Sequence, residues 1–274
     1  MAGADVSRRW DVDLGINGRA ALVGGGSSGL GRAAAEALAA EGCRIAIWSR
    51  DRDRLETTAE ELRRHHGVDV ATIVADAADP EAATTVAASA EAALGAVDIV
   101  ILNAGGPPPV DPTTTDPAGW ARSFQLLATT PIELATLLLP GMRARGWGRL
   151  VAILSSSIRQ PISDLVYSTG GRSALTAWLK TTSRAVAADG VTVNGVLPGR
   201  LSTARIESLD SARAAASSHT VDEVRAGHLA TIPAGRYGRP EELGALVAFL
   251  CSDRAGYITG TFPAVDGGLI AGLP

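Results

Sequence analysis

A glycine-rich stretch from Gly24 to Gly31 has the residue types and spacing that suit the binding of a diphosphate. The apolar run Ala20–Val23 predicts a buried strand before it, and an apolar repeat from Leu30 predicts a helix after it. Glycines in such a turn let the backbone approach phosphates, and the free N–H groups of the helix attract the anion. A flexible turn is the alternative interpretation. The residues assigned to the dinucleotide site here are Gly25, Ser27, Ser28, Gly29, Leu30 and Gly31.

Strand-like and helix-like segments alternate along the rest of the chain. Helices of ten or more residues between buried strands predict an α/β fold, a single-domain, Rossmann-type doubly wound parallel sheet of about seven strands with helices on both faces. We expect an N-terminal arm over 1–17, one domain over 18–274, and a substrate-covering segment over 200–236. The expected strands are 20–23, 44–48, 68–75, 97–102, 149–154, 191–196 and 261–265, and the main expected helices are 29–41, 51–66, one from near Pro80, 117–145, 165–188 and 240–250.

The composition excludes several classes of function. Of the 274 residues, 46% are hydrophobic and the formal net charge is −4, so we expect no nucleic-acid partner. Cys43 and Cys251 have no metal-ligand or redox spacing, which predicts reduced thiols, no metal site and a cytoplasmic protein. Residues 1–17 lack the apolar core of a signal peptide, and no apolar run is long enough to span a membrane.

Polar or glycine-containing signatures follow six successive predicted strands. Ligands of doubly wound sheets bind beyond the carboxyl ends of the strands, where these residues would gather. We therefore expect a small-molecule site at that edge of the sheet. After the glycine turn, the residues in question are Ser49, Arg50, Asp76, Asn103, Ala104, Gly105, Ser155, Pro198 and Gly199.

These motifs resemble those of the short-chain dehydrogenase/reductase family over about residues 18–270. The cofactor loop of that family is similar to Gly24–Gly31, with Gly24 in place of a threonine. Its Asn-Asn-Ala-Gly motif is similar to Leu102–Gly105, and its Pro-Gly-x-x-x-Thr motif is intact in Pro198–Thr203. The segments Gly235–Glu242, Tyr257–Gly260 and Val265–Gly268 resemble the 3-oxoacyl-reductase-like branch.

The resemblance implies positions for the parts of a dinucleotide. Asp76 and Ala77 would border the adenine, and Asn103, Ala104 and Gly105 the ribose on the adenine side. Pro198, Gly199 and Thr203 would meet the nicotinamide side. It also implies a small-molecule substrate and a homodimer or homotetramer.

The residues after the second strand favour NADP(H) over NAD(H). An acid usually binds the ribose 2′-hydroxyl of NAD there, whereas an arginine accommodates the 2′-phosphate of NADP. Ser49 stands at the acid's position and Arg50 follows. A solvated helix start, with Arg50 beside Arg52 and Arg54, is the alternative.

The catalytic positions depart from the family pattern. The family uses a serine, a tyrosine, a lysine four residues after the tyrosine, and an asparagine on the preceding long helix. Aligning Arg172–Leu175 with the family's Lys-Ala-Ala-Leu places Arg172 at the lysine and Ser168 at the tyrosine, while Ser155 keeps the serine. Leu127 falls at the asparagine. Arg172 would then contact both substrate and cofactor.

Tyr167 is the one phenol next to these positions. At a helix N-terminus it could reach the site and act as proton donor, with Arg172 lowering the pKa of the phenol. Alternatively, it only packs at the mouth of the pocket. His219 and His228 could face the substrate. Asp164 is expected to cap the helix that begins near 165, and an acid of the site is the alternative.

Three functions remain open at this stage. The first is an NADP(H)-dependent oxidoreductase that acts on a carbonyl or an alcohol through an atypical active site. The second is a non-redox isomerase, cyclase or lyase on the same scaffold, and the third is a catalytically inactive, nucleotide-binding partner protein.

Overall fold

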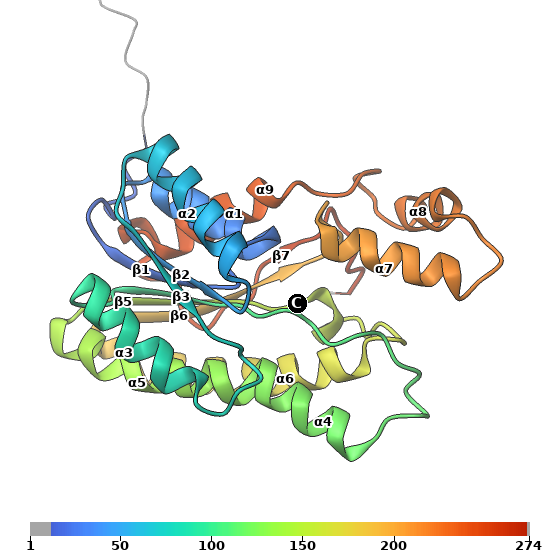
Figure 1. Cartoon of the computed structure of the whole chain (residues 1–274), viewed down its shortest axis with the longest axis horizontal. Coiled ribbons are helices and arrows are strands. Elements are labelled where there is room, and N and C mark those ends of the chain that lie inside the picture. Colours follow the sequence, from blue (N-terminus) through green and yellow to red (C-terminus); the bar gives the residue numbers. More distant parts are fainter. Residues whose placement is uncertain (1–11, 273–274) are drawn as a thin grey trace, which may run out of the picture.

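The computed structural model describes residues 12–272, which form seven parallel strands in one sheet (Figure 1). The strand order is β3-β2-β1-β4-β5-β6-β7, so the predicted doubly wound sheet is confirmed. The strands are β1 (Ala20–Gly24), β2 (Arg44–Ser49), β3 (Val70–Val74), β4 (Ile99–Leu102), β5 (Gly148–Ile153), β6 (Val191–Pro198) and β7 (Ala264–Val265).

Helices cover both faces of the sheet, as Figure 1 shows. On one face, α1, α2 and α9 enclose a core that includes Leu38, Leu62 and Val247. On the other face, α3, α5 and α6 enclose a core that includes Val86, Leu138 and Leu179. The α-helices are α1 (Gly29–Ala40), α2 (Arg52–His66), α3 (Ala82–Leu94), α4 (Pro117–Phe124), α5 (Thr130–Arg145), α6 (Val166–Val186), α7 (Ala204–Ala215), α8 (Val221–Ala230) and α9 (Pro240–Cys251).

The central strands are apolar because both of their faces are covered. Every residue of β1, β4, β5 and β6 is buried, the pattern expected of a parallel sheet between two helical layers. The register pairs Leu22 of β1 with Ala46 of β2 on one side and with Val100 of β4 on the other. Strands β2 and β3 therefore lie on one side of β1, and β4 to β7 lie on the other. Doubly wound sheets bind ligands beyond the carboxyl ends of the strands at such a switch point.

Strands β3, β4 and β7 are shorter than the expected 68–75, 97–102 and 261–265, and two helices also differ from the sequence-based expectation. The third helix begins at Ala82 and not near Pro80, because Asp79 and Glu81 form a turn in which the Asp79 carboxylate accepts the Glu81 N–H at 3.0 Å. The long helix expected over 117–145 contains a π-helical turn, Gln125–Thr129, between α4 and α5. Such turns often mark functional sites.

The expected N-terminal arm lies mostly outside the described residues. The described part of the arm packs against the domain, because Ile16 is only 1% exposed and its carbonyl accepts the Cys43 thiol at 3.3 Å. Leu14 accepts the backbone N–H of Asp253 at 2.9 Å. Residues 14–16 therefore belong to the packed domain.

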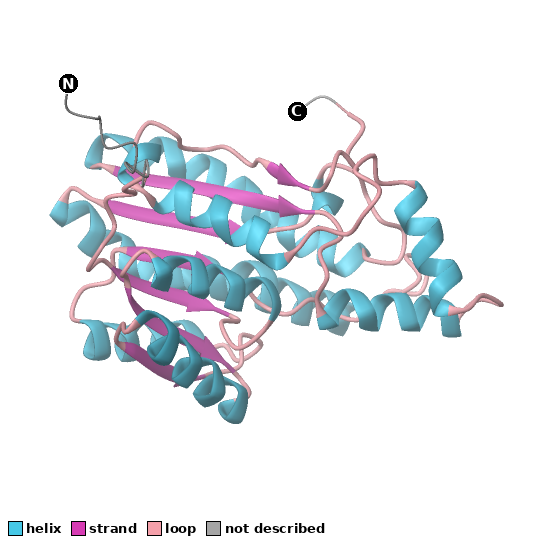
Figure 2. Ribbon diagram, turned by 90° about the horizontal axis from the view of Figure 1, so that it is seen from above, coloured by secondary structure: helices cyan, strands magenta, loops and turns pink. Residues whose placement is uncertain are grey.

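The segment expected to cover the site forms α7 and α8, which project past the carboxyl ends of the strands (Figure 2). Thr203 caps α7 and Thr220 caps α8, each through its side-chain oxygen. We call residues 200–237 the lid.

Candidate functional site

The glycine turn between β1 and α1 is held in one shape by its neighbours. The side-chain amide of Asn103 donates to the carbonyl of Gly24 at 3.0 Å, which ties the ends of β1 and β4 together. On the other side, Thr58 of α2 donates to the carbonyl of Ser27 at 3.3 Å. A Cβ on Gly31 would overlap the carbonyl oxygen of Gly25, so the turn requires a glycine there.

The first turn of α1 is free to bind an anion. Ser28 precedes the helix, but its side chain makes no capping hydrogen bond. Gly25 and Gly29 adopt positive φ of 59° and 55°, which directs the backbone around this helix end at little steric cost. The residues present therefore fit the diphosphate of a dinucleotide.

The end of β2 offers a cation and no free acid. Arg50 is exposed after the half-buried Ser49. The next acid, Asp51, caps α2 by accepting the Arg54 N–H at 3.1 Å, and its other oxygen pairs with the Arg54 side chain at 3.2 Å. The Asp51 carboxylate is thus already used in starting the helix.

Other residues expected at the cofactor follow the carboxyl ends of β3, β4 and β6. Ala77 is buried and its carbonyl accepts the Thr130 hydroxyl at 2.8 Å, whereas Asp76 is exposed. Open space surrounds the position of a Cβ on Gly105. The methyl of Thr203 would lie 3.7 Å from a Cβ on Gly29, so the start of α7 reaches the glycine turn.

Gly199 lies at a close contact between the end of β6 and the segment that follows β7. Its N–H donates to the carbonyl of Val265 at 3.0 Å, and a Cβ would lie 2.7 Å from the Cα of Asp266. Only a glycine lets β6 pass so close to the segment after β7, and from there the chain turns toward Thr203.

Ser168 and Arg172 meet on α6. The Arg172 guanidinium donates through Nη1 to the Ser168 hydroxyl oxygen. Burial, together with the neighbouring Arg205, lowers the pKa of Arg172 to about 10, which still leaves it cationic at neutral pH. Ser155 ends the loop after β5 and accepts the Ser157 N–H at 3.1 Å, and the short helix 156–158 that follows packs on α6.

Tyr167 points into the start of α4. Its hydroxyl accepts the backbone N–H of Asp116 at 2.8 Å and lies 3.3 Å from the Asp116 carbonyl. Its ring packs edge-on against Trp120, with centroids 5.0 Å apart, and a Cβ on Gly119 would overlap the phenol. This geometry supports the packing alternative for Tyr167, because both lone-pair and proton sides of the phenol face the Asp116 backbone.

Leu127 lies in the π-helical turn and is 4% exposed. A Cβ on Gly171 would lie 2.9 Å from the Cβ of Leu127, so this turn presses directly on α6 one residue before Arg172. Leu127, Asn103 and Arg172 also line one small cavity. An apolar side chain therefore occupies the wall next to the Arg172 guanidinium.

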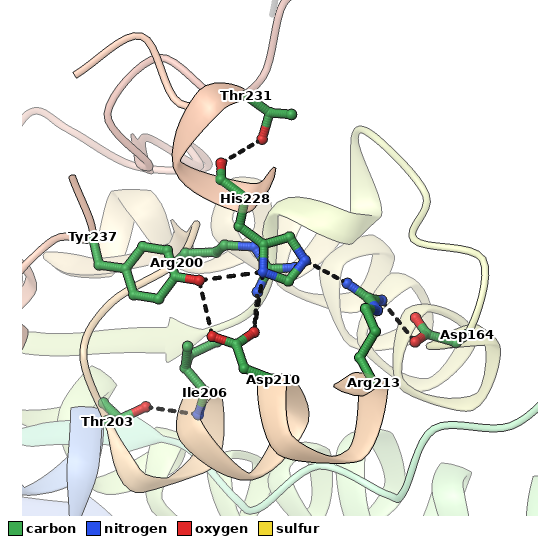
Figure 3. A network of polar contacts seen from close by, with 9 residues as sticks. All are labelled: Asp164, Arg200, Thr203, Ile206, Asp210, Arg213, His228, Thr231 and Tyr237. Carbon is green, nitrogen blue, oxygen red and sulfur yellow. Dashed lines mark hydrogen bonds and ion pairs between the residues drawn. The ribbon is translucent and has the colours of Figure 1, made fainter. Parts of the chain in front are cut away.

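The lid holds a buried polar network around His228 (Figure 3). Arg200 and Arg213 each donate to Nε2 of His228, at 2.8 and 2.7 Å. Nδ1 lies 3.1 Å from Asp210, which also accepts the Tyr237 hydroxyl at 2.9 Å. These partners assign a neutral imidazole with its proton on Nδ1, because Nε2 must accept from two cations.

The pKa values of this network follow from the same contacts. Burial first, and then the Arg200 charge, lowers the pKa of His228. Burial and the hydrogen bond to Asp210 raise the pKa of Tyr237 to about 12. The expectation that His228 could face the substrate is therefore wrong in this structure, because both ring nitrogens are bound within the lid.

Asp164 tethers the lid to the body of the domain. Its Oδ2 accepts Arg213 of α7 at 2.7 Å (Figure 3). Asp164 was expected to cap α6, but the residue before α6 is Leu165 and no side chain caps it. The carboxylate binds the lid instead.

Within the part of the chain that the structure describes, no group of three or more His, Cys, Asp or Glu side chains could hold a metal ion. No helix among residues 12–272 has both the length and the hydropathy to cross a membrane.

Comparison with known proteins agrees with this architecture. The family model described as "Enoyl-(Acyl carrier protein) reductase" matches residues 25–270. The 3-oxoacyl-[acyl-carrier-protein] reductase FabG of Escherichia coli is 31% identical over 256 residues, 93% of this chain and 99% of that protein. This chain belongs to the short-chain dehydrogenase/reductase family. It is therefore an oxidoreductase of the short-chain dehydrogenase/reductase type.

Two solved structures of the same fold contain the phosphorylated dinucleotide. L-Sorbose reductase from Gluconobacter frateurii, complexed with NADPH and L-sorbose, has a TM-score of 0.90 and 32% identity, and the match covers 95% of this chain and 100% of that one. A putative gluconate 5-dehydrogenase from Beutenbergia cavernae with bound NADP has a TM-score of 0.85 and 32% identity over the same shares.

Within this short-chain dehydrogenase/reductase, sequence reasoning missed the arginines of the lid. Arg205 donates to the carbonyl of Pro107 at 2.6 Å, which joins α7 to the loop after β4. Arg200 pairs with the buried Asp210 at 3.2 Å. Their positions next to the Pro198–Thr203 motif were the available signal. Lys180, the only lysine of the chain, instead donates to the carbonyl of Gly260 at 2.7 Å.

Proposed function

We propose that this protein is an NADP(H)-dependent oxidoreductase that acts on a carbonyl or alcohol substrate through Ser155, Ser168 and Arg172. The observation that carries the proposal is the hydrogen bond from Arg172 to the Ser168 hydroxyl oxygen. A hydroxyl that accepts from a cation still has its own proton to donate, and it donates more strongly. Ser168 is thus suited to bind the oxygen of a carbonyl.

The glycine turn would bind the diphosphate, and Arg50 the 2′-phosphate that distinguishes NADP(H). The NADPH and NADP complexes of the two similar structures support this choice. Asp76, Ala77, Asn103, Ala104 and Gly105 would border the adenine side, and Pro198, Gly199 and Thr203 the nicotinamide side. When bound, the cofactor supplies or accepts a hydride at the carbon of the substrate.

The chain's own residues would manage the charge on the substrate oxygen. Ser155 and Ser168 donate hydrogen bonds to it, and Arg172 stabilises negative charge there as a fixed cation. Arg172 does not release its proton at neutral pH, so water must supply the proton through the serine hydroxyls. Leu127 excludes a polar side chain from the wall beside Arg172. We therefore expect slow proton transfer, and Tyr167 acts as a packing residue.

The test is NADPH binding followed by single-turnover oxidation with a panel of carbonyl compounds. We expect Arg172→Gln and Ser155→Ala each to lower the single-turnover rate about 100-fold, the cost of one oxyanion donor. Arg122→Gln, which changes an exposed arginine of α4, is the matched control.

Other outcomes lead to the alternative functions. NADPH binding without oxidation by any compound would point to a non-redox isomerase, cyclase or lyase, or to an inactive nucleotide-binding partner. A rate that Tyr167→Phe abolishes would restore the phenol as proton donor. A homodimer or homotetramer and a cytoplasmic location stay predictions.

A further inference from the structure

Two arginines from distant parts of the chain meet beside the loop after β4. A Cβ on Gly106 would lie 3.4 Å from Nη2 of Arg205 and 3.8 Å from Nη1 of Arg172. Arg172 lies inside, on α6, and Arg205 is exposed at the start of α7. The two guanidinium groups thus lie on either side of Gly106, with Arg172 on the inner side and Arg205 toward solvent.

Neither guanidinium has a carboxylate partner among residues 12–272. Arg172 donates to the Ser168 hydroxyl and Arg205 to the Pro107 carbonyl, and both of these acceptors are neutral. The Nε of Arg172 is buried and has no hydrogen-bond partner within the described chain. A buried charged group without a full set of partners is costly, so such an arrangement suits a ligand that completes it.

Two other arginines of the lid already have carboxylate partners. Asp210 binds Arg200 at 3.2 Å, and Asp164 binds Arg213 at 2.7 Å. Arg172 and Arg205 have no such partner among residues 12–272. A carboxylate of the ligand would supply the missing negative charge, since guanidinium groups bind carboxylates in a bidentate geometry.

We propose that Arg172 and Arg205 form a carboxylate-binding subsite, so that the substrate is an oxo acid or the corresponding hydroxy acid. The proposal rests on the proposed function of the same site. Arg172 also contacts Ser168, which places the subsite next to the reacting carbonyl. The diphosphate is a second possible source of an anion, but Thr203 approaches the glycine turn while the Arg205 guanidinium reaches Pro107 instead.

The experiment measures binding to the protein saturated with NADP⁺, by titration calorimetry. The probes are acetoacetate, 2-oxobutyrate and 2-oxoglutarate, each compared with its methyl ester. We expect at least one oxo acid to bind at least tenfold more tightly than its ester, the lower range for a hydrogen bond to a charged group. Arg205→Gln should remove that preference, Arg205→Lys should keep part of it, and Arg122→Gln should leave it unchanged.

The affinity for NADPH, measured on the same variants, separates the two sources of the anion. We expect Arg205→Gln to change the dissociation constant of NADPH less than threefold. A loss of NADPH affinity as large as the loss for the oxo acid would assign the pair to the diphosphate and overturn the proposal. Equal binding of every acid and its ester, or no binding of any acid, would overturn it as well.

Failure of the subsite and failure of the proposed function can be told apart. Binding needs no turnover, so a carboxylate preference without hydride transfer would contradict only the proposed oxidoreductase. Turnover of neutral carbonyl compounds with no preference for acids would contradict only the subsite. Circular dichroism of each variant confirms that the fold is retained.

Discussion

The cofactor side and the substrate side of the candidate site differ in how closely they follow the family pattern. On the cofactor side, Gly25, Gly29 and Gly31 and the run Asn103–Gly105 keep the family pattern, although Gly24 and Leu102 depart from it. We expect backbone atoms to bind the cofactor there, and a Cβ on Gly31 would collide with the Gly25 carbonyl. On the substrate side, the alignment with the family pattern leaves only Ser155 unchanged and predicts Leu127, Ser168 and Arg172 at the other three positions. Backbone geometry tolerates few substitutions, whereas side-chain chemistry can change on an unchanged scaffold.

The lid belongs with the substrate side in this comparison. Hydrogen bonds join Arg205 to Pro107, 98 positions away, and Arg213 to Asp164, 49 positions away, while Arg200 pairs with Asp210 inside the lid. The cofactor side depends on close packing, and the substrate side depends on charge. Variants of each kind should therefore produce different defects.

The largest effect should come from Gly31→Val. The new side chain would overlap the Gly25 carbonyl, so the turn must open, and we expect NADPH affinity to fall more than 100-fold. Fluorescence titration with NADPH measures this. Gly227→Ala, at a helix position with open space around it, is the control and should bind NADPH normally. Unchanged affinity of Gly31→Val would contradict the assignment of this turn to the diphosphate.

A smaller effect is expected from Arg50→Ala. If Arg50 binds the 2′-phosphate, the ratio of NADPH to NADH affinity should fall about tenfold, because a charge-assisted hydrogen bond is lost. Arg52→Ala removes the next exposed arginine and should leave the ratio unchanged. A ratio that responds equally to both variants would support the solvated-helix interpretation of this cluster.

Tyr167→Phe should affect stability more than turnover. It leaves the Asp116 N–H without its acceptor and costs about 1 kcal/mol of unfolding free energy. Urea denaturation measures the cost, and the single-turnover rate should change less than threefold. Loss of turnover with unchanged stability would contradict the assignment of Tyr167 as a packing residue.

The smallest effect concerns the pH dependence set by His228. Its pKa in the folded chain is lowered from 6.5, so the unfolded chain binds more protons between the lowered value and 6.5. Stability should therefore fall as the pH drops below about 6.5, and His228→Gln should reduce this dependence. Urea denaturation at pH 8, 7, 6 and 5 measures it, with His65→Gln on the exposed end of α2 as control. An identical pH dependence in both variants would contradict the neutral imidazole.

Much of the fold and of the cofactor side could be predicted from the sequence. Apolar runs and glycine turns are local signals, and they correctly predicted seven parallel strands and the turn at Gly24–Gly31. The start of α3 was less predictable, because Asp79 and Glu81 form a turn that competes with a helix start at Pro80. The π-helical turn Gln125–Thr129 has no recognisable signature in the sequence, so it could not be predicted.

The sequence alone predicted the doubly wound parallel sheet, the glycine turn and, by alignment with the family pattern, the departures at Leu127, Ser168 and Arg172. Only the tertiary structure decided where side chains on the substrate side point. Tyr167 turns toward Asp116, 51 positions away, and Arg205 meets Arg172 through the loop at Gly106. Periodicity encodes which face of an element is buried, but the partner of a polar side chain depends on how distant elements pack, and that information is spread over the whole chain.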